Sequence, residues 1–210
     1  SAASDVYKRQ QHIGAINTIV KTDDRLTGYN TDACGALEAL RQTHTLLADQ
    51  HVLILGSGGA ARAIAFGLAL HEPIASLTIL GIIDEERASL AADLRKGTKV
   101  TIQEATLNEE TLGPALAQSQ VLIHCTPLGM HPKVDDTCVP KHLLKADLTV
   151  MDIVYNPRET RLLREAKEIG CSTIPGLEMF LNQAIAQFEL WTGQPAPTKL
   201  MREILEAQFS

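Results

Sequence analysis

The stretch that decides the fold is His51-Val52-Leu53-Ile54-Leu55-Gly56-Ser57-Gly58-Gly59-Ala60-Ala61-Arg62. Its first five residues form an apolar run that predicts a buried strand, and a helical pattern from Ala60 to about Leu70 follows the glycines. A glycine-rich turn between a strand and a helix is typical of a dinucleotide-binding site. Gly56 permits the tight turn, Gly58 lets the backbone approach a diphosphate, and the helix start presents unpaired N–H groups. The alternative is a tight turn of the same shape that binds nothing.

Strand and helix patterns alternate along the rest of the chain. Apolar strand patterns recur at 77–80, 99–103, 121–125, 148–153 and 172–174. Helical patterns separate them at 85–94, 110–118 and 159–169, and two more close the chain at 177–191 and 198–207. This order predicts an α/β fold, a Rossmann-like doubly wound parallel sheet with helices on both faces.

A hairpin is expected ahead of this sheet. Residues 13–20 and 26–29 have the composition of two strands, and 22–25 supply the turn between them. Asn30-Thr31-Asp32 then opens an amphipathic helix. The apolar face of that helix contains Ala33, Ala36, Leu37 and Leu40.

Composition narrows the class of protein. The 210 residues are 45% hydrophobic and 21% charged, as in ordinary globular domains, and the net charge of −6 argues against a nucleic-acid or anionic-membrane partner. No apolar run approaches the roughly 20 residues that cross a bilayer, and no signal-peptide pattern is present. We therefore expect a cytoplasmic protein that acts on a small molecule.

The four cysteines form no CxxC pair and are expected to be reduced thiols. A zinc site made of His124, Cys125, His131 and Cys138 is the one metal alternative, and its spacing matches no known ligand pattern. We predict no metal site.

Six motifs, taken together and in order, resemble the shikimate dehydrogenase family. They are GAINT at 14–18, GYNTD at 28–32, GSGGAAR at 56–62, CTPLGM at 125–130, DIVYNP at 152–157 and PGLEMFLNQAIAQFELWTG at 175–193. The resemblance runs from about residue 13 to the C-terminus. It implies an oxidoreductase of aromatic amino acid biosynthesis that transfers a hydride between NADP or NAD and the 3-dehydroshikimate/shikimate pair. A quinate or quinate/shikimate dehydrogenase is the alternative among enzymes, and a non-catalytic nucleotide-binding module is the alternative outside them.

The resemblance also implies roles for individual residues. Asp32 matches the acid of a catalytic Lys–Asp pair, and the implied substrate-binding positions are Asn17, Asp32, Tyr155 and Gln183. The implied cofactor-binding positions are Gly56, Ser57, Gly58, Gly59, Ala60, Ala61, Thr126, Ile153, Gly176 and Met179.

Each role has a plainer interpretation. Asp32 could simply cap the helix that it opens, Asn17 could bond an edge backbone group, and Gln183 could be a surface residue. Tyr155 and Met179 could be ordinary core residues.

The sequence departs from the family pattern at its start. The family's catalytic lysine precedes the GAINT motif, and neither Lys8 nor Lys21 lies in the matching motif. We therefore expect this chain to bind cofactor but to turn over poorly or not at all, and its uncovered apolar surface to invite self-association. The expected divisions are a non-native or disordered segment at 1–12, a remnant of the substrate-binding domain with a connecting helix at 13–48, the dinucleotide-binding domain at 49–176, and helices packing toward the substrate side at 177–210.

Two departures concern the cofactor. The family usually has Asn-Arg-Thr after the second strand, where this chain has Gly81-Ile82-Ile83 followed by the acidic run 84–86. Those carboxylates would repel a 2′-phosphate unless Arg87 reaches back, although an acidic first helical turn also complements the helix dipole. The choice between NADP and NAD stays open. In the cofactor-facing loop, His124-Cys125 stands where the family more usually has Asn-Ala.

Overall fold

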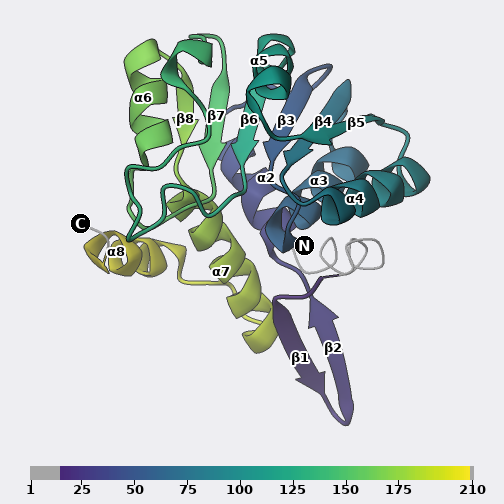
Figure 1. The fold of residues 1–210 in the computed structure, drawn as a ribbon. Coiled ribbons are helices and arrows are strands. Elements are labelled where there is room, and N and C mark those ends of the chain that lie inside the picture. Colours follow the sequence, from purple (N-terminus) through teal and green to yellow (C-terminus); the bar gives the residue numbers. More distant parts are fainter. Residues whose placement is uncertain (1–14, 209–210) are drawn as a thin grey trace.

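A computed structural model describes residues 15–208, and the segment expected to be non-native lies outside this range. The chain forms a parallel six-stranded sheet in the order β5-β4-β3-β6-β7-β8, with helices on both faces (Figure 1). The strands are β3 (His51–Leu55), β4 (Ser76–Gly81), β5 (Thr101–Thr106), β6 (Val121–His124), β7 (Thr149–Asp152) and β8 (Ser172–Ile174). The predicted Rossmann-like sheet is confirmed, with its order reversing between β3 and β6.

Two hydrophobic cores cover the two faces of the sheet, because alternate residues of each strand point to opposite sides. Val52 and Ile54 of β3 belong to the core beneath α2 (Asp32–Gln42), α3 (Gly59–His71) and α4 (Asp84–Gly97). Leu53 and Leu55 belong to the other core, which contains α5 (Glu109–Gln118) and α6 (Arg161–Ile169). The continuous apolar run of β3 thus reflects a strand buried on both faces.

A two-stranded antiparallel hairpin extends away from the sheet beside the end of α7 (Gly176–Thr192), as Figure 1 shows. Its strands are β1 (Thr18–Thr22) and β2 (Arg25–Tyr29). The hairpin is tied to α7 by two hydrogen bonds: Gln187 Nε2 donates to Thr18 Oγ1 at 3.1 Å, and Trp191 Nε1 donates to the Ile19 carbonyl at 3.1 Å. The last helix, α8 (Thr198–Gln208), returns toward the start of α7, where the Arg202 guanidinium donates twice to the Glu178 carboxylate.

The predicted elements are present, with differences at their ends. The first strand begins at Thr18, so the described part of 13–20 ahead of it, residues 15–17, is not strand; residues 13 and 14 lie outside the described range. In residues 15–17 only the Asn17 amide bonds the opposite strand, donating to the Tyr29 carbonyl at 2.9 Å. A 3-10 helix at Lys141–Leu143 was not predicted. Within the described range, no helix combines the length and apolar character needed to cross a membrane.

Candidate active site

The glycine turn joins β3 to α3 at the point where the strand order reverses. Gly56 has φ +110°, and a Cβ there would lie 2.7 Å from the carbonyl oxygen of Cys125, so glycine is required on both counts. Gly58 is the N-cap of α3 and supplies no side-chain cap. A Cβ at Gly58 or Gly59 would meet nothing within 4 Å. Open space therefore lies at the start of α3, where backbone N–H groups and the helix dipole favour a diphosphate.

The loop after β6 faces this turn across the switch point, since the Cys125 amide donates to the Leu55 carbonyl at 2.8 Å. A cavity of about 380 Å³ lies along this loop and the one after β7. Thr126, Ile153 and Tyr155 are among its lining residues. Its position at the carboxyl ends of parallel strands is where open α/β sheets bind ligands.

Asn17 is the centre of a polar cluster that joins the hairpin to two helices. Its Nδ2 donates to Asp32 Oδ1 at 2.8 Å, to Thr31 Oγ1 at 3.1 Å and to Gln183 Oε1 at 3.4 Å. Its Oδ1 accepts from the Thr31 amide at 3.0 Å and from the Thr18 hydroxyl at 2.8 Å. The structure thus brings together three of the four predicted substrate-binding residues, from segments up to 166 positions apart.

Close packing of α2 on α7 brings these residues together. A Cβ at Gly35 would lie 2.8 Å from the Met179 carbonyl oxygen and 3.0 Å from the Gln183 amide nitrogen, so the two helix backbones nearly touch there. Asp32 begins α2 less than one turn before Gly35, and Gln183 therefore lies beside it. Met179 itself is buried in the core.

Asp32 does not cap α2. Thr31 is the N-cap and makes no side-chain cap hydrogen bond, whereas Asp32 is the first helical residue and accepts from Asn17. The helix-capping alternative is therefore wrong, because the carboxylate points into the cluster. Burial raises the pKa of Asp32, and the hydrogen bond from Asn17 partly lowers it. A cation or hydroxyl donor placed beside this carboxylate would be strongly attracted.

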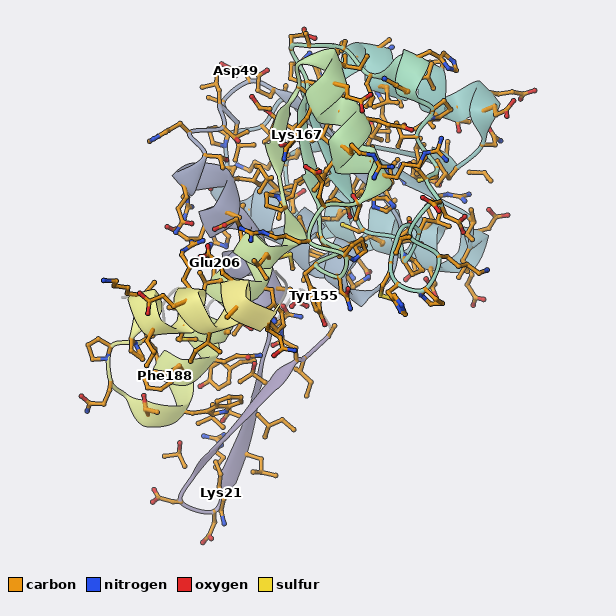
Figure 2. All side chains as sticks on the ribbon, turned by 90° about the vertical axis from the view of Figure 1, so that its left-hand side faces the viewer. Lys21, Asp49, Tyr155, Lys167, Phe188 and Glu206 are labelled. Atoms are coloured by element: carbon orange, nitrogen blue, oxygen red, sulfur yellow. The ribbon has the colours of Figure 1, made fainter. Side chains whose placement is uncertain are left out.

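Tyr155 lies between the sheet and the hairpin, whereas Lys21 is at the far tip of the hairpin (Figure 2). The Tyr155 ring stacks on Phe180 of α7, with centroids 4.6 Å apart and planes inclined by 21°. Because the tyrosine is 39% exposed and lines the cavity, it forms a wall of the cavity rather than core. Lys21 lies well away from that wall.

A buried network behind the β6 loop was not predicted. His124 Nδ1 lies 2.9 Å from Asp152 Oδ1, and His124 Nε2 lies 2.5 Å from Thr126 Oγ1. Asp152 Oδ2 accepts from the Thr160 hydroxyl at 2.6 Å. Burial lowers the pKa of His124, but the hydrogen bond to the Asp152 carboxylate and its negative charge, with a smaller contribution from the neighbouring Cys138, outweigh burial and raise the pKa to about 9. A charged imidazole donates from both nitrogens, so Thr126 Oγ1 would accept from Nε2 and its hydroxyl proton would be left for another acceptor.

The sequence signal for this network is the unusual His124-Cys125 pair, from which only a change in the cofactor-facing loop is expected. Within the described range, no three His, Cys, Asp or Glu side chains form a group that could hold a metal ion. His124, one of the four residues considered as zinc ligands, has both ring nitrogens in hydrogen bonds, to Asp152 and to Thr126.

The charged His124 has a consequence for stability that can be tested. The folded-state pKa lies above the ordinary 6.5, so the stabilisation is complete below pH 6.5 and is lost as pH rises through about 9. The expected loss of unfolding free energy is on the order of 3 kcal/mol. Urea unfolding at pH 6.5 and pH 9 measures it. His124→Asn should flatten the dependence, and His142→Asn, at an exposed histidine, should not; equal pH slopes in all three proteins would contradict the assignment.

Comparisons with known proteins agree with this geometry. Residues 176–206 match the family model of the shikimate 5′-dehydrogenase C-terminal domain, and 52–171 match that of the saccharopine dehydrogenase NADP binding domain. A shikimate dehydrogenase (NADP(+)) from Dehalococcoides mccartyi is 41% identical over 196 residues, covering 93% of this chain and 68% of the relative.

Two solved structures share the fold over most of the chain. Shikimate 5-dehydrogenase from Listeria monocytogenes, in complex with shikimate and NAD, has a TM-score of 0.87 and 33% identity, over 94% of this chain and 70% of that one. Quinate dehydrogenase from Corynebacterium glutamicum, in complex with NAD, has a TM-score of 0.86 and 27% identity, over 95% and 70%.

Proposed function

Because this chain belongs to the shikimate dehydrogenase family, we propose that it binds a nicotinamide dinucleotide at the Gly56–Gly59 turn and serves hydride transfer between that cofactor and the 3-dehydroshikimate/shikimate pair. The observation that carries the proposal is the open space over Gly58 at the start of α3. A side chain at Gly58 or Gly59 would meet no protein atom, so packing within the protein does not explain why glycine is present there. A turn that must leave room for a ligand does explain it.

The proposed cofactor site continues from the turn, Gly56 to Ala61, along the β6 and β7 loops. Thr126 and Ile153 line the cavity there, and Thr126 would donate to an oxygen of the ligand. We assign Gly176 and Met179, at the start of α7, to the same site, since Gly176 lies against the carbonyl oxygens of the cavity residues Ile153 and Val154. The nicotinamide supplies or accepts the hydride when bound, and the residues of this chain hold and orient it.

The proposed substrate site is the Asn17–Asp32–Gln183 cluster with Tyr155 as its wall. Amide groups suit a polyhydroxylated ring because they both donate and accept. A hydride that reaches a ketone carbon leaves negative charge on the oxygen, which must then receive a proton. Asp32 would hold the cationic donor implied by the family's Lys–Asp pair. Burial is the main reason that the pKa of Cys125, which lines the cavity, is raised, and the charges of Asp152 and Asp32 add to this effect.

In this proposal residues 13–48 contribute to substrate binding, 49–176 bind the dinucleotide, and 177–210 pack back toward the substrate side. The hydrogen bonds of Gln183 to Asn17 and of Gln187 to Thr18 support this division, since they join α7 to the hairpin.

Titration calorimetry of the chain with NADP, NAD, shikimate and quinate separately tests the proposal. We expect a dinucleotide to bind, and shikimate to bind more tightly than quinate. Tighter binding of quinate would favour the quinate alternative, which the likeness to the Corynebacterium glutamicum enzyme keeps in view. Binding of a dinucleotide with neither ring acid would favour a non-catalytic nucleotide module, and binding of neither dinucleotide would overturn the proposal.

Asp32→Asn tests the role of the buried carboxylate. The asparagine retains an oxygen that can accept from Asn17 but loses the charge, and hydrogen bonds to charged groups are stronger by about 1 kcal/mol or more. We expect shikimate binding to weaken about tenfold, dinucleotide binding to be unchanged, and stability to be equal or higher, because burial disfavours the charge. Asp24→Asn, in the exposed hairpin turn, is the matched control. Unaltered shikimate affinity in Asp32→Asn would remove Asp32 from the site.

A further inference from the structure

The carboxyl end of β4 is the position at which dinucleotide-binding sheets of this order discriminate between the two coenzymes. In a sheet of this order the adenosine ribose lies beyond the end of the second strand, which is β4 here. This end adjoins the glycine turn, since a Cβ at Gly81 would lie 2.9 Å from Ser57 Oγ. The next two residues, Ile82 and Ile83, are 75% and 50% exposed. Their apolar side chains offer no hydrogen bond to a 2′-phosphate.

Arg87 reaches back to this strand end, but its guanidinium is held inside the protein. Its Nη1 donates to the Gly81 carbonyl at 2.9 Å and to Asp84 Oδ1 at 2.7 Å. Its Nε donates to Glu104 Oε2 on β5 at 2.5 Å, and its side chain is only 10% exposed. Turning toward a 2′-phosphate would break these bonds and leave the half-buried Glu104 without its cation. The positive charge of Arg87 is therefore already compensated by the carboxylates of Asp84 and Glu104.

The surrounding charge is negative. Asp84, Glu85 and Glu86 fill the first turn of α4, and the Asp84 carboxylate is 77% exposed. With Glu104 this gives four carboxylates against the single guanidinium of Arg87 in this group. Arg62, at the start of α3, forms an ion pair with Asp93 of α4. A phosphate brought here would be repelled, whereas a ribose hydroxyl could donate to Asp84.

We propose that Asp84 and the internally paired Arg87 make this site select NAD over NADP, with Asp84 accepting from the 2′-hydroxyl of the adenosine ribose. The inference rests on the proposed function, which leaves the coenzyme open. It sets this chain apart from its relatives named for NADP(+), whereas two of the similar solved structures hold NAD.

Equilibrium titration of the chain with NAD and with NADP gives the two dissociation constants. We expect NAD to bind at least tenfold more tightly. Asp84→Asn keeps an oxygen that can accept but removes its negative charge, which weakens both the bond to the ribose hydroxyl and the hold on Arg87. NAD affinity should therefore fall, NADP affinity should rise, and their ratio should change at least tenfold. Glu85→Gln makes the same charge change in the same exposed turn without touching Arg87, and should change the ratio less than threefold.

Glu104→Gln is a second variant, which loosens Arg87 from β5 and should raise NADP affinity alone. Circular dichroism spectra confirm that each variant is folded. Tighter or equal binding of NADP by the unaltered chain overturns the inference and leaves the proposed function standing. An equal ratio change in Asp84→Asn and Glu85→Gln also overturns it, because the effect would then be general charge. Failure of both coenzymes to bind overturns the proposed function itself.

Discussion

Replacing Gly58 by alanine should abolish tight coenzyme binding while leaving the fold intact. The backbone at Gly58 has φ −72° and ψ −172°, which any residue can adopt, and a Cβ there meets no protein atom within 4 Å. The cost to stability should therefore stay near that of an altered N-cap, about 1 kcal/mol or less. The new methyl group would instead occupy the space through which a diphosphate reaches the first amides of α3.

We expect the affinity for NAD and NADP to fall by more than tenfold, measured by calorimetric titration, with the unfolding midpoint nearly unchanged. Gly113→Ala is the matched control, because its Cβ would meet only Leu143 at 3.9 Å in a helix that does not form the site. Coenzyme binding by Gly58→Ala at the original affinity would mean that the diphosphate does not lie against this turn.

The sheet and the glycine turn could be predicted because their signals are local. The run His51–Leu55 and the glycines after it determine their own conformation within a dozen residues, and burial on both faces explains the unbroken apolar pattern. The hairpin was predicted for the same reason, through the turn at 22–25. The predicted start of its first strand, at residue 13, was too early, because β-branched composition does not show where pairing with β2 begins.

The polar networks could not be predicted because their members come from elements that are far apart in the sequence. His124 and Asp152 are 28 positions apart and meet only because β6 and β7 pair in a register that aligns them. Arg87 on α4 and Glu104 on β5 are brought together by the packing of the helix on the strand. The sequence leaves open whether Arg87 reaches back to the strand end, and the structure shows that it does so as part of an internal ion pair. The Asn17–Gln183 contact depends on how closely α2 and α7 approach, a property of Gly35 that no spacing pattern shows.

Gly176 should be the position least tolerant of a side chain. It begins α7 and is buried, and a Cβ there would lie 2.4 Å from the Val154 carbonyl oxygen and 2.5 Å from that of Ile153. Both neighbours are backbone atoms at the end of β7, which cannot move aside as a flexible side chain would. Its φ is not positive, so the constraint is this approach and not backbone strain.

Gly176→Ala should therefore lower the unfolding free energy by about 3 kcal/mol or more, since overpacking a fixed backbone contact cannot be relieved locally. Displacing α7 should also move Gln183 away from Asn17, so ring-acid binding should weaken along with stability. Urea unfolding measures the first effect and titration with shikimate the second. Gly193→Ala, at a left-handed helix end where a Cβ meets nothing within 4 Å, should cost only about 1 kcal/mol. Similar losses in the two variants would mean that conformational freedom, and not the contact with residues 153 and 154, explains the glycine at 176.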